Sequence, residues 1–128
     1  MLRRRRLLAT AVSLAFGAFF FMPCQPVKSL FSTRRELAIS DLSTYELALE
    51  YYATDHDGEY PAALSALIEP HDDGFTYLKA LTLIPDPWER PYIYERKAGG
   101  RGWRLICYGA DGKPGGSGEA RDLLVESK

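Results

Sequence analysis

One stripe of apolar side chains in the first half of the chain constrains the fold most. Its members recur at spacings of four, three, four and three residues, at Ala38, Leu42, Tyr45, Leu49 and Tyr52. This spacing places them on one face of an α-helix. The preceding Thr33-Arg34-Arg35-Glu36 is typical of a capping box, in which a hydroxyl and a carboxylate bind free backbone amides at a helix start. We therefore predict one long amphipathic helix from about Thr33 to Gly58, where glycine supplies a left-handed exit.

The residues after this helix favour turns and short strands. Residues 60–70 predict a short second helix, with a proline in its first turn and another at its end. The prolines of PDPWERPY forbid both helix and central strand at residues 85–92. Residues 92–95 and 103–108 are rich in β-forming residues and are joined by glycines, which predicts a hairpin. This order of elements indicates an α+β fold, a long helix on a small antiparallel sheet.

An aromatic residue in the proline-rich turn is a candidate for the core. Trp88 is large and sits between prolines that fix the backbone, so we expect it to be structural and to fill a small core. The other predicted members of that core are Leu42, Tyr45, Leu49, Tyr92 and Leu105.

Residues 1–26 indicate a signal or anchor segment, followed by one domain at residues 27–128. Arginines at 3–6 precede an uncharged apolar run of 16 residues, from Leu7 to Met22, whereas a comfortable membrane span needs about 20. Three outcomes remain open: a retained inner-membrane anchor, cleavage near residues 15–18, and lipid attachment at Cys24. The arginines favour the cytoplasm, so each outcome places the domain outside it. Two prolines after the run predict that the anchor helix and the body helix are separate.

Charge and composition exclude several classes of function. Without the arginine-rich segment the chain keeps 12 basic and 17 acidic residues, so it offers nucleic acid no basic face. The nucleophile motif G-x-S-x-G and the zinc motif H-E-x-x-H are both absent. Asp55-His56-Asp57-Gly58 begins like an EF-hand loop, but Leu64 stands where the bidentate glutamate is needed. We predict a protein that is not an enzyme and binds no nucleic acid.

A glycine-rich stretch near the carboxyl end is the candidate site. Five glycines lie between residues 109 and 118. Pro114 follows Lys113, where a phosphate-binding loop needs serine or threonine and then a helix, so a phosphate cradle is excluded. Two interpretations stay open. The stretch is a calcium loop whose tight backbone turns carbonyl oxygens inward, or a solvated tail whose acids face water.

Three motifs follow one another along the chain. They are D-x-x-G-x-Y-P at residues 55–61, D-P-W-x-R-P-Y-x-Y at 86–94, and Y-G-A-D-G-x-x-G-G-x-G at 108–118. With these motifs, residues 35–123 resemble the G-type major pseudopilin of bacterial type II secretion systems. The resemblance implies a long amino-terminal helix on a small antiparallel sheet, a calcium ion in the final loop, and no catalysis. It also implies assembly with protein partners into a periplasmic pseudopilus.

The resemblance also implies a set of calcium ligands. Asp111 and Asp122 match acidic positions of the family's loop, and the Tyr108 carbonyl is the expected backbone ligand. Ser117 and Glu119 are further candidates. Ala120 and Arg121 stand where members of the family commonly carry further acids. A cation beside Arg121 is repelled, so the expected affinity for calcium is lower than usual.

The chain departs from the family in ways that leave two functions open. No acid precedes Glu36, so the prepilin-peptidase signal and the assembly glutamate are missing, and Glu89 replaces the glycine usual after D-P-W. The first function is a non-enzymatic subunit or accessory protein of a type II secretion system, anchored in the inner membrane with its domain in the periplasm. The alternative is a stand-alone binding or structural module of the cell envelope, anchored by the membrane segment or by lipid, that does not polymerise.

Overall fold

The computed structural model describes residues 33–128. The basic and apolar segment at 1–26, Cys24, and the predicted break between an anchor helix and the body helix lie outside the described residues. Within residues 33–128, no helix combines the length and the apolar character that a membrane crossing requires.

The long helix that the apolar stripe predicts is confirmed as α1, which spans Arg34–Asp55. The Thr33 hydroxyl accepts the Glu36 amide at 3.2 Å, and the Thr33 amide donates to the Glu36 carboxylate at 2.9 Å, so the capping box is confirmed. The chain leaves the helix through Gly58, whose φ is 84°. Four of the five stripe residues are buried, and Tyr52 packs partly buried beside them.

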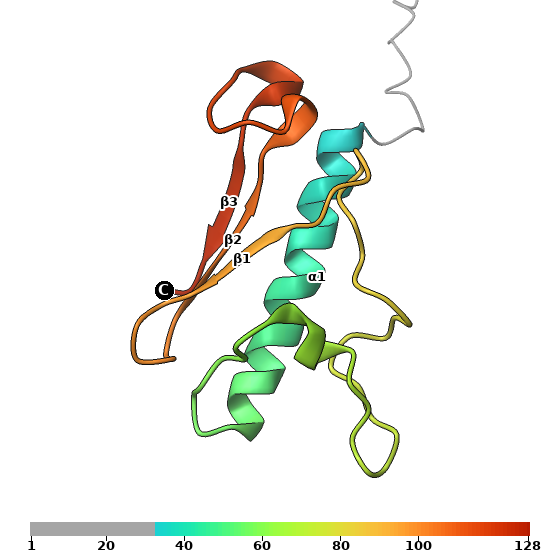
Figure 1. The fold of residues 1–128 in the computed structure, drawn as a ribbon, viewed down its shortest axis with the longest axis vertical. Coiled ribbons are helices and arrows are strands. Elements are labelled where there is room, and N and C mark those ends of the chain that lie inside the picture. The colour runs from blue at the N-terminus through green and yellow to red at the C-terminus, as the bar shows by residue number, and fades with distance from the viewer. Residues whose placement is uncertain (1–32) are drawn as a thin grey trace, which may run out of the picture.

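The helix packs against one three-stranded antiparallel sheet in the order β1-β2-β3 (Figure 1). The strands are β1 (Ile93–Arg96), β2 (Trp103–Cys107) and β3 (Leu123–Glu126). The predicted hairpin is confirmed as β1 and β2, whereas the sequence did not predict β3. In the central strand Leu105 lies opposite Tyr94 of β1 and Val125 of β3. These three positions belong to the sheet face that is packed on the core.

The predicted second helix at residues 60–70 is wrong. Only a short 3₁₀ turn, η1 (Leu64–Leu67), forms there. Ala63 is extended, with φ −146° and ψ 154°, so a helix cannot continue through it. Leu64 and Leu67 are both buried, and their spacing of three places them on one side of a 3₁₀ turn. The segment therefore buries two leucines without completing an α-helix.

The core lies between α1 and the sheet. The tryptophan buried within it is not the one that the sequence singled out. Trp103 of β2 is 0% exposed, whereas Trp88 is only partly buried and packs against the edge of the core. Trp88 therefore packs against the core as the sequence predicts, but Trp103 lies deeper in it. The other predicted core members, Leu42, Tyr45, Leu49, Tyr92 and Leu105, are all buried.

Candidate metal-binding loop

The glycine-rich stretch forms a closed connection between two paired strands. We call residues 108–122, from the end of β2 to the start of β3, the glycine loop. It contains two 3₁₀ turns, η2 (Gly109–Asp111) and η3 (Gly118–Ala120), which contact each other. The loop lies at the end of the molecule where α1 begins (Figure 1). Because the chain returns into β3, the stretch is not a free tail.

Close backbone packing explains two of the glycines in the loop. Gly109 has φ 66°, and a Cβ built there would lie 2.7 Å from the Glu119 carbonyl oxygen. Gly116 has φ 84°, and a Cβ there would lie 2.5 Å from the Ala120 carbonyl oxygen. L-residues with a side chain rarely adopt this backbone conformation, and here they would also collide with the main chain. Gly109 lets the two halves of the loop touch, and Gly116 lets the chain fold closely onto η3.

Asp122, one of the predicted metal ligands, points a carboxylate oxygen into the loop. Its Oδ2 accepts the Gly115 amide at 2.9 Å, and its Oδ1 is buried with no hydrogen-bond partner. A buried charged oxygen without a donor is costly and calls for an explanation. A bound cation would supply the missing interaction, so Asp122 fits the role that the sequence predicts for it.

The other predicted ligands lie in the same loop but are more exposed. Asp111 ends η2, and its Oδ1 accepts the Lys113 amide at 3.1 Å. Ser117 and Glu119 are exposed, and Tyr108 is half-buried where η2 begins. Among residues 33–128, no three histidine, cysteine or acidic side chains gather closely enough to hold a metal. A cation here would therefore depend on backbone carbonyls, which calcium accepts among its about six to eight oxygens.

A buried acid beside the loop organises the turn of the second motif. Asp86 is 5% exposed, and its Oδ1 accepts the amides of Trp88 at 3.0 Å and Arg90 at 2.8 Å. Its Oδ2 lies 3.5 Å from Arg90 Nε and accepts the Cys107 thiol at 3.7 Å. Burial raises the pKa of that thiol, which therefore keeps its proton. Asp86 thus holds the turn and one arginine in fixed positions.

Two arginines that the sequence did not predict as site residues contact the loop. Arg90 donates to the Gly109 carbonyl, and Arg35 donates to the Arg121 carbonyl at 2.7 Å. The fixed spacing of the D-P-W-x-R motif could have indicated a role for Arg90. Nothing local to Arg35 indicates a contact with a carbonyl 86 residues away.

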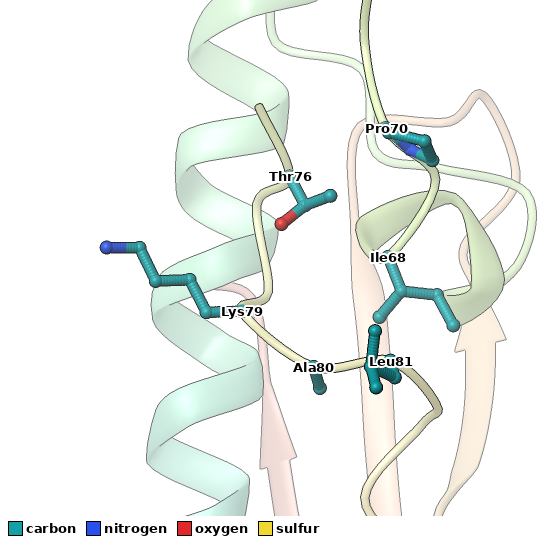
Figure 2. A pocket seen from close by; sticks show the side chains of 6 residues that line it. All are labelled: Ile68, Pro70, Thr76, Lys79, Ala80 and Leu81. Carbon is teal, nitrogen blue, oxygen red and sulfur yellow. The ribbon is translucent and has the colours of Figure 1, made fainter. Parts of the chain in front are cut away.

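A separate depression of about 530 Å³ lies outside the glycine loop (Figure 2). Its walls are mainly apolar, and the Lys79 side chain extends away from Ile68 and Leu81 (Figure 2). No acid, histidine or cysteine lines it. The lining residues are Ile68, Pro70, Thr76, Lys79, Ala80 and Leu81. This surface therefore brings together no set of groups for acid–base or nucleophilic chemistry.

The family model described as type II secretion system protein G matches residues 27–126. This range contains the whole fold from α1 to β3, the Asp86 turn and the glycine loop. No curated protein matches the chain significantly.

Proposed function

Since the chain belongs to the type II secretion system protein G family, we propose that it is a pseudopilin-like subunit or accessory protein of such a system. The family match over residues 27–126 carries this proposal. Pseudopilins are structural components of the cell envelope that work through contact with other secretion proteins. We place residues 1–26 in the inner membrane as the anchor and the α+β domain in the periplasm. No catalytic step is part of this role.

We also propose that calcium orders the glycine loop. The buried, unpartnered Oδ1 of Asp122 supports this proposal, because a cation would satisfy it. Asp122 and Asp111 would supply carboxylate oxygens, and the Tyr108 carbonyl a backbone oxygen. Ser117 and Glu119 would complete the set from exposed positions. A bound ion would tie the two halves of the loop together, and the millimolar affinity of extracellular sites suffices in the periplasm.

Thermal unfolding of the full chain with calcium and then with a chelator tests the metal. A ligand that binds only the folded state stabilises it, by about 2.7 kcal/mol when the free ligand is in hundredfold excess over Kd. The melting temperature rises as a result. Asp111→Ala should abolish the difference between the two conditions. Glu69→Ala removes an exposed acid outside the loop and should keep the difference. A parent protein that melts identically in calcium and chelator does not use the ion.

Cross-linking in intact cell envelopes tests the protein role. A pseudopilin-like subunit should give adducts with other pseudopilins, and these adducts should disappear from envelopes that lack those partners. The second candidate is a stand-alone envelope module that does not polymerise. It is favoured by residues 1–35, which contain no acid where the resemblance leads us to expect an assembly glutamate. The module would be favoured if no cross-linked product contains a pseudopilin and secretion stays normal when the protein is deleted.

A further inference from the structure

Each of the two 3₁₀ turns in the glycine loop has its first carbonyl bound by an arginine. Arg90 donates to the carbonyl of Gly109, where η2 begins. Arg35 donates through one nitrogen to the carbonyl of Gly118, where η3 begins, at 3.5 Å, and to that of Arg121 at 2.7 Å. The two halves of the loop are thus fastened in the same way by residues from elsewhere in the chain.

The two arginines come from different supports. Arg90 belongs to the Asp86 turn, and the buried Asp86 carboxylate fixes both its amide and its side chain. Arg35 is the second residue of α1, directly after the capped helix start. Its neighbour Arg34 is exposed and makes neither of these contacts with the loop. Arg34 therefore provides a matched control for Arg35.

Apart from the bond from the Gly115 amide to the Asp122 carboxylate at 2.9 Å, the hydrogen bonds within the loop are long. Its turns are closed by backbone hydrogen bonds of 3.1 to 3.4 Å, at the long end of the normal range. Its glycines lose more conformational freedom on ordering than any other residue. Hydrogen bonds from a guanidinium are stronger than those between neutral groups. The arginine contacts are therefore the strongest direct ties between this loop and the rest of the fold.

We propose that Arg35 and Arg90 are positioning residues that close the glycine loop, and that Arg35 couples the order of the loop to the first turn of α1. This inference rests on the proposed function, because the two arginines hold in place the loop to which calcium is proposed to bind. The arginines act on carbonyls whether or not an ion is bound. The first turn of α1 and the glycine loop then open and close together. Because coupling between two sites is reciprocal, a change at either one affects the other.

Hydrogen exchange of the full chain, measured in chelator, tests the Arg35 contact. Arg35→Gln should speed exchange of the amides of residues 112, 115, 120 and 121 by roughly tenfold. This factor corresponds to the lower limit of the stability that a hydrogen bond from a charged donor contributes. Arg34→Gln should leave them unchanged. Amides of β1 and β2 should exchange as in the parent, which separates local opening from general destabilisation. Equal exchange in the loop of both variants would overturn the proposal.

The reverse direction of the coupling, from the loop to the helix, is tested at two glycines where an added side chain would meet similar backbone strain. Gly115 and Gly116 have φ of 94° and 84°, but a Cβ at Gly115 meets nothing within 4 Å, whereas one at Gly116 collides with Ala120. Gly116→Ala should therefore open the loop and also speed exchange of the Glu36 and Leu37 amides, several-fold more than Gly115→Ala does. Unchanged exchange at the helix start in Gly116→Ala would refute the coupling.

Repeating the experiment with calcium keeps this inference separate from the metal. If calcium has no effect on the parent protein but Arg35→Gln still opens the loop, the arginine role stands and the calcium role fails. If Arg35→Gln changes exchange only when calcium is present, the arginine does not close the loop by itself and the inference is wrong.

Discussion

Glu89 occupies a backbone conformation that suits glycine. Its φ is 64°, and its amide closes the Asp86 turn by donating to the Asp86 carbonyl at 2.8 Å. For residues with a Cβ this left-handed conformation costs about 1–2 kcal/mol. Glycine adopts such a φ without a steric cost, because it has no Cβ. The strain is therefore local and removable.

We expect Glu89→Gly to stabilise the protein by up to about 1 kcal/mol. The relief of strain is offset in part by the greater freedom of glycine in the unfolded chain, worth about 0.4–1 kcal/mol. Denaturant unfolding measures the difference. Asp57 also has positive φ, at 53°, but aspartate tolerates this region better, so Asp57→Gly should gain less. A loss of stability in Glu89→Gly, or a larger gain in Asp57→Gly, contradicts this account.

The candidate site was predictable residue by residue only where a side chain acts within its own motif. Asp111 and Asp122 were predicted as ligands because they match acidic positions of the pseudopilin loop that the sequence resembles. Which of them turns a buried oxygen inward depends on how the loop folds back, and the structure assigns this to Asp122. The two tryptophans show the same limit. Trp88 and Trp103 are equally large and apolar, but Trp103 lies in the central strand and is fully buried in the core, whereas Trp88 packs at its edge.

The start of α1 offers a test in which two threonines have opposite effects. Thr33 caps the helix, and Thr33→Ala should lower stability by about 1 kcal/mol because the Glu36 amide loses its acceptor. Thr54 lies near the other end, exposed, with its hydroxyl donating to the Glu50 carbonyl at 2.9 Å. Thr54→Ala should change stability by less than about 0.7 kcal/mol, and upward, since alanine favours helix. Denaturant unfolding of both variants checks the signs, and equal losses would exclude the capping role.

Elements with a complete local signal were predicted, and those that depend on partners were not. The capping box and the apolar stripe of α1 act within one helix, so its position was predicted within a few residues. In β3, only Leu123, Leu124 and Val125 are apolar, and they show no alternation. Their strand conformation comes from pairing with β2, where Val125 lies opposite Leu105. The prediction of a helix at residues 60–70 failed for the same reason. The burial of Leu64 and Leu67 decides the conformation of that segment.

Tyrosine hydroxyls tie distant parts of the whole domain together. Tyr92, directly before β1, donates to Asp41 of α1 at 2.9 Å, and Tyr77, between η1 and β1, donates to Asp55 of α1 at 2.9 Å. Tyr94 of β1 donates to the Pro61 carbonyl at 2.8 Å. Each bond requires a protonated hydroxyl. The packing of helix, loop and sheet therefore depends on these groups staying neutral.

Alkaline pH should unfold the domain for this reason. Burial raises the pKa of Tyr94 from 10.0 to about 12, and burial followed by the hydrogen bond to Asp55 raises that of Tyr77 from 10.0 to about 12. The folded state holds these protons more tightly than the unfolded chain does. Their contribution to stability is thus complete below pH 10.0 and is lost as the pH rises to about 12.

Denaturant unfolding at a series of pH values between 10.0 and about 12 measures this loss. Each tyrosine should contribute a fall of up to about 1.4 kcal/mol per pH unit. Tyr77→Phe removes one titrating hydroxyl, so its stability should be lower at neutral pH but fall less steeply than that of the parent. Tyr51 is 58% exposed, and Tyr51→Phe should keep the parent slope. Parallel curves for the parent and Tyr77→Phe would mean that this hydroxyl does not link folding to pH.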